Sequence, residues 1–289
     1  MESQENQYRW PKAEAVYPDR PGRSYTLKRL RYRLRAFLHR GLIAQFEQFI
    51  NQHPFLVKLL NEHADYSYPL VYRFLDKRFN RKQRFQAICD NLRFLPEKLT
   101  ALSTPIYKTP LSFGVVIPDF EMTLSMTTHQ PMEGYWVLEL WHKPRNELVY
   151  LPTFAKLGES LLISVVQGPN FEGSKEMVKQ LTKTCYGLRP AYLMVETMKA
   201  LTKVLGFNQL LGIPQKYQNK SRFIQSSHYV VDYDAIFSES GGQLKDYWEL
   251  PLEIDRNLDE VPSKKRSMYR KRYAMLDDLA KVIEEKLEL

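Results

Sequence analysis

Arg189 stands where an arginine side chain could bind an anion. Gly187 is placed to end one helix and Pro190 to begin the next, so Arg189 lies at a helix amino terminus, where the backbone dipole already favours negative charge. A guanidinium at that place can hold a carboxylate or a phosphate through two hydrogen bonds. A salt bridge to a neighbouring acid of the protein is the alternative, and the sequence leaves both open.

A second candidate anion site follows a predicted strand over residues 161–167. The loop Gln167-Gly168-Pro169-Asn170 leads to a helix start near Ser174. A loop and a helix start at the end of a buried strand often form a ligand site in α/β proteins, because free backbone amides there bind anions. The residues that we expect to hold a cofactor or donor at this place are Gln167, Gly168, Gly173, Ser174 and Arg189.

The chain lacks the sharpest nucleotide-binding and metal-binding motifs. It contains no Gly-rich loop ending in Gly-Lys-Ser/Thr, no His-Glu-x-x-His and no Cys-x-x-Cys, so we expect no metal site. The two cysteines, Cys89 and Cys185, cannot form a disulfide framework. Cys185 stands inside a predicted helix, where the usual role of a cysteine is that of a small buried residue rather than a nucleophile.

The chain has 289 residues and a net charge of +9, and the excess of cations is confined to its amino-terminal part. Residues 1–100 contain 19 Lys and Arg against 10 Asp and Glu, whereas residues 101–289 contain 23 of each. A localised positive field attracts an anionic partner, such as a phospholipid surface, an envelope component or nucleic acid, without choosing among them. A merely solvated basic surface is the alternative.

A basic amphipathic helix is predicted from residue 27 to residue 40. Apolar residues recur there at helical spacing, and the positions between them are cationic with no acid among them. Such a helix can lie on an anionic membrane with its apolar stripe buried, or it can dock on its own domain with the stripe in the core. The cations that would meet an anionic surface are Lys28, Arg29, Arg31, Arg33 and Arg35.

A second basic cluster lies near the start of the last predicted helix, which Pro262 opens. Cations at a helix amino terminus oppose the helix dipole, so local helix stability does not explain them. Either an anionic partner or an internal acidic surface around Asp255, Asp259 and Glu260 would compensate their charge. The residues of this cluster assigned to anion or membrane binding are Lys264, Lys265, Arg266 and Arg270.

Nucleic acid is a weaker hypothesis for the anionic partner. Residues 71–94 interleave cations with Tyr72, Phe74, Phe79 and Phe85, a composition that can bind single strands by base stacking. These aromatic residues fall at helical core spacing, however, which favours packing within the protein.

The periodicities predict an α+β fold with an irregular arm over residues 1–24 and a basic helical region over residues 25–105. From residue 106 onward, alternating patterns predict strands over residues 120–126, 135–141, 147–154 and 161–167, which form an antiparallel meander. A helical crossover then lets residues 207–213 return parallel to the last of these strands. A further strand over residues 244–252 and a final helix complete the domain. The polar start of the chain and the lack of a membrane-spanning apolar window predict a cytoplasmic protein, so any membrane role would be peripheral on the inner membrane.

Residues 167–273 resemble the VirK/YbjX family of Gram-negative bacterial proteins. The resemblance implies a role in the cell envelope, in virulence and in resistance to cationic antimicrobial peptides, and it implies no particular chemistry. The ordered set of motifs that carries it comprises Val166-Gln167-Gly168, Leu181-Thr182-Lys183, Gly187-Leu188-Arg189-Pro190, Leu211-Gly212-Ile213, Asp232-Tyr233-Asp234, Glu239-Ser240-Gly241-Gly242, Pro262-Ser263-Lys264-Lys265-Arg266 and Tyr269-Arg270-Lys271-Arg272-Tyr273.

The order of elements over residues 161–252 also resembles the GNAT-like acyltransferase fold. That resemblance implies a mixed, mostly antiparallel sheet with flanking helices, and an acyl or aminoacyl donor held by the loop after residue 167. It also implies that Tyr233 or His228 could protonate a leaving thiolate, while Glu139 or His142 could deprotonate an amine. Asn170 and Glu172 replace the small residues of the GNAT-like loop, so the identity of the donor stays open.

Three functions follow as hypotheses. The first is a VirK/YbjX-like envelope protein that transfers an acyl or aminoacyl group to an envelope component. The second is a non-enzymatic, membrane-peripheral adaptor that binds anionic lipid or an envelope protein, and the third is a nucleic-acid-binding protein.

Overall fold

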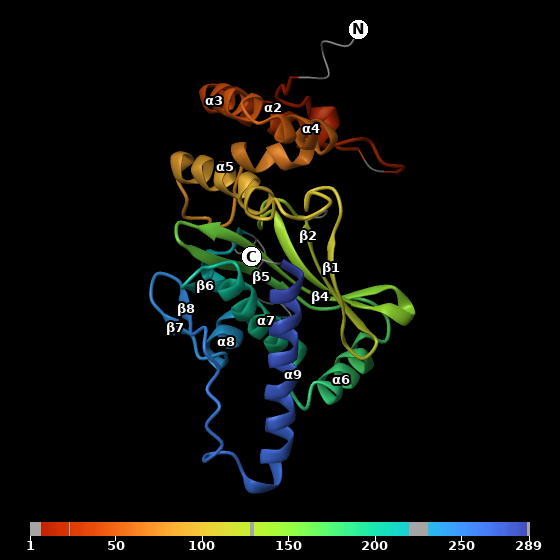
Figure 1. Cartoon of the computed structure of the whole chain (residues 1–289). Helices are drawn as coiled ribbons and strands as arrows, with labels where there is room; N and C mark the ends of the chain where they lie inside the picture. Colours follow the sequence, from red (N-terminus) through yellow and green to blue (C-terminus); the bar gives the residue numbers. More distant parts are fainter. Residues whose placement is uncertain (1–6, 23, 128–129, 220–230, 288–289) are drawn as a thin grey trace.

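The computed structural model describes residues 7–287 except residues 23, 128–129 and 220–230. Helices α1 to α5 gather at one end of the molecule, next to a twisted sheet against which the later helices pack (Figure 1). Within the described residues the strands form one eight-stranded sheet. Helices at the amino terminus followed by a mostly antiparallel mixed sheet with flanking helices confirm the predicted α+β class.

The helical end comprises α1 (Ala13–Val16), α2 (Thr26–Leu38), α3 (Arg40–Asn51), α4 (Pro54–Glu62), the 3-10 helix η1 (Ala64–Val71) and α5 (Arg81–Lys98). Asn80 begins α5 with a capping box, in which its side chain accepts the backbone N–H groups of Lys82 and Gln83. The predicted helix over residues 71–94 therefore starts about ten residues later than the periodicity indicates. It also continues through Pro96 to its end at Lys98.

The first described residues pack on the helical end, although the sequence predicts an irregular arm there. Tyr8 is buried, and its backbone N–H and hydroxyl donate hydrogen bonds to Asn51 Oδ1 and Ser67 Oγ. Trp10 stacks on Tyr32 with ring centroids 6.1 Å apart. Aromatic side chains thus hold a segment whose prolines and polar residues suggest no regular structure.

Strands β1 to β5 form an antiparallel meander, and each is hydrogen-bonded to the next along the chain. Alternation between apolar and polar residues in β2 places every second side chain in the core, as the sequence predicts. The bounds are β1 (Leu111–Ile117), β2 (Phe120–Met126), β3 (Trp136–His142), β4 (Glu147–Leu157) and β5 (Ser160–Gln167), with a 3-10 turn η2 (Lys143–Arg145) after β3.

Two helices, α6 (Ser174–Thr184) and α7 (Pro190–Val204), connect β5 to β6 (Leu210–Gly212), which pairs with β5 in parallel as predicted. The sheet ends with β8 (Trp248–Leu250) and β7 (Gln243–Leu244) beyond β6. The predicted strand over residues 244–252 is therefore a short hairpin. Strand β1 is not predicted, because Gly114 and two register shifts interrupt its alternation.

The remaining helices close one side of the sheet. The 3-10 turn η3 (Gln215–Tyr217) follows β6. Helix α8 (Tyr233–Glu239) packs its Phe237 ring against Gly212 of β6, where a Cβ atom would lie 2.7 Å from the ring. Helix α9 (Ser263–Leu287) contacts α7 and begins at the end of the molecule opposite to α2 (Figure 1). Across the described ranges, no helix is both long and apolar enough to span a bilayer.

Candidate functional site

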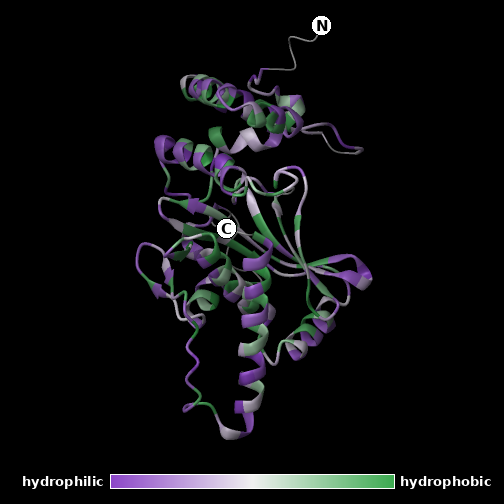
Figure 2. Cartoon of the chain, in the orientation of Figure 1, coloured by the Kyte–Doolittle hydropathy of each residue, from purple (hydrophilic) through white to green (hydrophobic). Residues whose placement is uncertain are grey.

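Helix α2 carries an apolar stripe that faces solvent. Positions 27, 30, 34, 37 and 38 share one side of a helix with 3.6 residues per turn. Large apolar surfaces are rarely left open in this way unless they bind something. Figure 2 shows green and purple residues alternating along the helices of this end. The exposed fractions are 69% for Leu27, 59% for Leu30, 58% for Leu34, 64% for Phe37 and 57% for Leu38.

The opposite side of α2 docks the helix on the protein. Tyr32 is 2% exposed, and its hydroxyl donates a hydrogen bond to the Pro11 carbonyl. Burial raises the pKa of this phenol far above its usual range. Arg29 donates to the Tyr17 carbonyl through Nε and Nη2, and Arg35 donates to the Tyr68 hydroxyl. Helix α2 therefore docks through tyrosine and arginine, while its leucines remain outside.

Two of the five predicted anion-binding cations of α2, Arg31 and Arg33, border the exposed stripe, whereas the other three lie toward the docked side of the helix. Of those three, Arg29 and Arg35 are hydrogen-bonded within the protein. Helical spacing places Arg31 along one border of the stripe and Arg33 along the other, and both are exposed. Arg33 pairs with the exposed Glu14, while Lys28 lies 4.8 Å from the centroid of the Tyr25 ring. The outer side of α2 thus combines an apolar stripe with a cationic border.

The basic start of α9 lies at the other end of the molecule from α2 (Figure 1). Lys264, Lys265 and Arg270 are exposed, while Arg266 donates hydrogen bonds to the carbonyls of Val261 and Asp259. Arg266 thus uses a backbone oxygen of Asp259 and not its carboxylate. The two predicted basic surfaces are therefore separate regions of the molecule and do not form one patch.

The predicted donor loop is held by contacts within the protein. Gln167 Nε2 donates to Glu133 Oε2 over 3.1 Å. Gly168 lies against Tyr150, whose ring atoms would stand 3.2 Å from a Cβ atom at that position. Gly173 has a φ of +81° and precedes Ser174, the first residue of α6, so the helix starts where the sequence predicts. The loop has the expected place in the fold.

Arg189 binds an acid of the protein. Its Nη2 forms a salt bridge with Glu239 and a 2.8 Å hydrogen bond to the Tyr192 hydroxyl, and the guanidinium lies 4.3 Å from the Tyr192 ring centroid. Burial, with the hydrogen bond to Glu239, raises the pKa of Tyr192 to about 12. Of the two roles that the sequence left open for Arg189, the structure shows the salt bridge to an acid of the protein. The arginine side chain is 61% exposed in this arrangement.

Strand β5 has a bulge at Ser164, close to the point where it separates from β6. Thr153 of β4 pairs with Val165, and the next residue, Phe154, pairs with Ile163. The Ser164 carbonyl, released from the ladder, accepts a 3.1 Å hydrogen bond from Gln218 Nε2. Bulges often lie beside active sites. In this structure the Gln218 side chain satisfies the carbonyl that the bulge exposes.

The three predicted catalytic residues with a described placement do not converge. Glu139 and His142 both lie on β3, but three positions apart, so they point to opposite faces of the sheet. His142 is buried against Phe120, with ring centroids 5.1 Å apart. Tyr233 is buried at the start of α8, and its backbone N–H donates to Gln215 Oε1. His228 lies outside the described residues.

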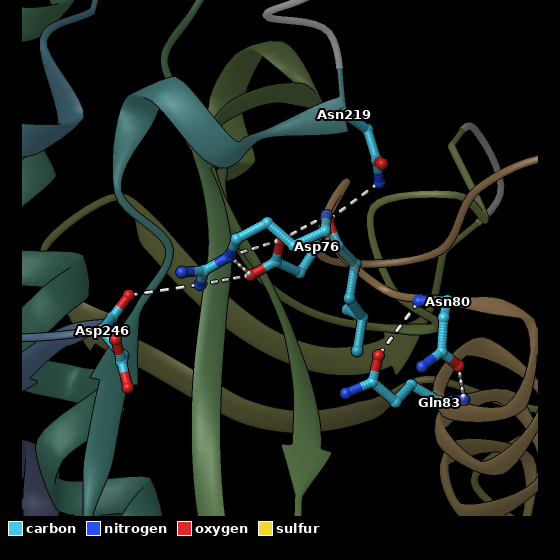
Figure 3. A network of polar contacts seen from close by, with 7 residues as sticks. Asp76, Asn80, Gln83, Asn219 and Asp246 are labelled. Atoms are coloured by element: carbon cyan, nitrogen blue, oxygen red, sulfur yellow. Dashed lines mark hydrogen bonds and ion pairs between the residues drawn. The ribbon is translucent and has the colours of Figure 1, made fainter.

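A polar network that the sequence did not indicate joins residues 73–78, which precede α5, to the segment after β6 and to the turn between β7 and β8 (Figure 3). Asp76 is 1% exposed, and Arg78 donates hydrogen bonds to both carboxylate oxygens through Nε and Nη2. The Arg78 guanidinium lies 3.8 Å from the Tyr217 ring centroid and 4.8 Å from that of Tyr247. Burial, with the nearby Asp76 carboxylate, raises the pKa of Tyr247 to about 12.

Further bonds of the same network tie residues 73–78 to residues 217–219. Arg73 Nη1 donates to the Asn219 carbonyl, and Asn219 Nδ2 donates to the carbonyls of Leu75 and Met132. Asp76 and Gln218 form an isolated antiparallel bridge. Aromatic residues of this segment are also engaged: Phe74 is fully buried, and Arg35 lies 4.0 Å from the Tyr72 ring centroid. The rings of Phe74 and Tyr72 are thus engaged in contacts within the protein.

Comparison with known proteins identifies relatives in Gram-negative bacteria. An uncharacterised Haemophilus influenzae protein is 79% identical over 282 residues, which cover 98% of this chain and 97% of the relative. The Mannheimia haemolytica "Membrane protein LapB" is 63% identical over 216 residues, 75% of this chain and 96% of the relative. The Escherichia coli protein YbjX is 25% identical over 279 residues, 89% of this chain and 83% of the relative.

No solved structure matches the chain significantly, so the GNAT-like resemblance rests on the order of elements alone. A family model described as "Protein of unknown function (DUF535)" matches residues 21–285, which include both α2 and the Asp76 network. The match to YbjX confirms the resemblance seen in the sequence motifs. The VirK/YbjX motifs of the carboxy-terminal half all lie within the residues that this family model matches. The chain therefore belongs to the DUF535 family.

Proposed function

We propose that the protein is a peripheral membrane protein of the bacterial cell envelope, which binds an anionic lipid surface through helix α2. The observation that carries the proposal is the apolar stripe of α2, with five large side chains that are each more than half exposed. Cations border the stripe, and the helix contains no acid. A helix of this composition lies in the plane of the headgroups with its apolar side buried.

The geometry of α2 favours binding to the surface over insertion across the bilayer. The 13 residues of α2 extend about 20 Å, which is less than the roughly 30 Å of a hydrocarbon core. Its inner side is fixed to the protein by Tyr32 and by Arg29, so only the outer side is free. The name of the Mannheimia haemolytica relative, a membrane protein, agrees with this proposal.

Charge at the border of the stripe should contribute to binding. Each cation near an anionic leaflet contributes about 1 kcal/mol, so Arg31→Ala with Arg33→Ala should weaken binding by roughly tenfold to thirtyfold. The measurement is co-sedimentation of the full chain with vesicles of digalactosyldiacylglycerol, an uncharged lipid without an ammonium group, that contain or lack phosphatidylglycerol. We expect binding to the anionic vesicles only, and a decrease as salt concentration rises.

Lys264→Ala with Lys271→Ala is the matched control, because it removes two exposed cations from the far end of the molecule. This variant should bind vesicles as the wild-type chain does. Equal losses in the two double variants would show a non-specific charge effect and contradict docking through α2. A stable dimer in light scattering that dissociates when the stripe is changed would identify a second copy as the occupant.

Acyl or aminoacyl transfer to an envelope component is our second candidate function. It is supported by the parallel β5–β6 pair after an antiparallel meander and by the bulge at Ser164 where the two strands separate. A donor at this place would have to displace Gln218 from the Ser164 carbonyl. Calorimetry of the chain against acyl-coenzyme A, acyl carrier protein and aminoacyl-tRNA should detect binding of one of them, and Gln218→Ala should strengthen it. If none of the three compounds binds, the chain has no donor site of this kind.

A further inference from the structure

Glu139 is a partly buried carboxylate on the sheet face opposite His142, and neutral groups hold it in place. Its Oε2 atom accepts hydrogen bonds from Thr123 Oγ1 at 3.2 Å, from Ser125 Oγ at 3.3 Å and from Trp141 Nε1 at 3.2 Å. All three donors point at the same oxygen. In the described part of the chain, no donor bonds to Oε1, which is therefore the oxygen that a ligand could use.

Glu139 is not part of an ion pair in the described portion of the protein. Among residues with a described placement, no Lys, Arg or His lies within ion-pair distance of this carboxylate. Glu121 of β2, which is directly opposite Trp141 on the same face, differs in this respect. Lys143 Nζ lies 2.6 Å from Glu121 Oε2, and its hydrogen bond lowers the pKa of Glu121. A partly buried carboxylate without a countercharge is costly, and a cationic ligand would remove that cost.

Trp141 adds a second feature that suits a cation. Its indole N–H is engaged by Glu139, so the ring is fixed in place next to the carboxylate. Nothing aromatic or cationic in the described ranges stacks on this ring, and Trp141 is partly exposed. The face of an indole attracts ammonium groups most strongly among the aromatic side chains. The edge of the sheet near Trp141 is accessible to solvent, since Val115 on β1 is 61% exposed.

We propose that Glu139 and Trp141 form a binding site for an alkylammonium group, with the carboxylate supplying the countercharge and the indole face the remaining contact. The group can belong to a small free amine or to the headgroup of a lipid, since both present the same chemistry. The proposal does not depend on docking of α2 to a membrane, because the site lies on the sheet.

Ligand-observed NMR titration of the full chain with choline and with ethanolamine tests the site. We expect saturable binding, and no binding of dimethylbutanol, the uncharged carbon isostere of choline. Glu139→Gln keeps the shape of the side chain and should weaken binding by about tenfold or more, because it removes the countercharge. Trp141→Leu should weaken binding by roughly threefold to tenfold. Trp141→Phe keeps an aromatic ring and should retain most of the binding, which would show that the loss in Trp141→Leu is not caused by misfolding.

Glu121→Gln is the matched control and should leave the affinity for choline unchanged, because Glu121 is already paired with Lys143. Binding of dimethylbutanol as tight as that of choline, full affinity in Glu139→Gln, or no saturable binding by the wild-type chain would each overturn the proposal. Glu139-dependent binding to phosphatidylethanolamine vesicles would identify a headgroup as the source, and binding of free choline or ethanolamine alone would identify a free amine. The Arg31→Ala, Arg33→Ala chain should bind choline normally, so failure of vesicle binding and failure of this site remain distinguishable.

Discussion

A chain in which Leu30, Leu34 and Phe37 are replaced by serine should lose binding to anionic vesicles by at least about 100-fold. Full burial of one such side chain contributes about 1.5–3 kcal/mol, and about 1.4 kcal/mol corresponds to a factor of ten in affinity. Even partial burial of three side chains in the headgroup region therefore exceeds the effect of the flanking cations. Co-sedimentation with phosphatidylglycerol-containing vesicles measures the loss.

The same substitutions should leave the fold intact, because these side chains are 58–64% exposed and make little contact with the core. Surface substitutions of this kind usually change the free energy of unfolding by less than about 0.5 kcal/mol. Val115→Ser with Leu244→Ser is the matched control, since both residues are exposed and apolar but lie on strands, at 61% and 52% exposure. Wild-type vesicle binding by the triple variant would show that the stripe has another role.

Arg78→Ala should lower the free energy of unfolding by about 3 kcal/mol, because it leaves the buried Asp76 carboxylate without its cation. The Asp76 side chain is fully buried, whereas that of Arg78 is 32% exposed. We expect a loss at the lower end of the range for broken buried pairs, because the Arg78 backbone N–H can still donate to Asp76 Oδ1 in the variant. Urea denaturation followed by circular dichroism measures the change.

Arg93→Ala provides the comparison for this variant. Arg93 forms an i,i+4 salt bridge with Glu97 in which both side chains are more than 40% exposed, so its removal should cost less than about 1 kcal/mol. If Arg78→Ala were as stable as Arg93→Ala, the Asp76 network would not hold the helical end on the sheet. A loss confined to one of two unfolding transitions would show that the helical end separates before the sheet unfolds.

The sequence predicted those parts of the fold whose information is local. Residues 120–126 alternate cleanly and form β2 with the predicted bounds, and the helical start at Ser174 follows from the residues before it. Strand β1 was missed because Gly114 and the register shifts beside it break the alternation. Residues 244–252 were predicted as one strand because the turn between β7 and β8 lacks a clear glycine or proline signal.

The functional surfaces, like the fold, could be predicted only where the information is local in the sequence. The amphipathic pattern of α2 was visible, but which side docks was not, because docking depends on Tyr17 and Tyr68, which meet the helix from other segments. The Asp76 network could not be predicted, since its partners Tyr217 and Tyr247 are distant in the sequence. Glu139 was a candidate base only through the GNAT-like resemblance, while its lack of a countercharge among the described residues required the structure.

The Asp76 network also constrains the order in which the chain can assemble. Arg73 bonds to Asn219 across 146 residues of sequence, so this contact closes a long loop and can form only after most of the chain is available. During synthesis, the helical end can acquire its own helices early, because their contacts are local. The bonds of Arg73 and Asn219 must therefore wait for residues 217–219 to emerge from the ribosome. The meander can dock on the helical end before that, because Asn91 of α5 bonds to Lys156 of β4 and its carbonyl accepts a hydrogen bond from Trp136 of β3.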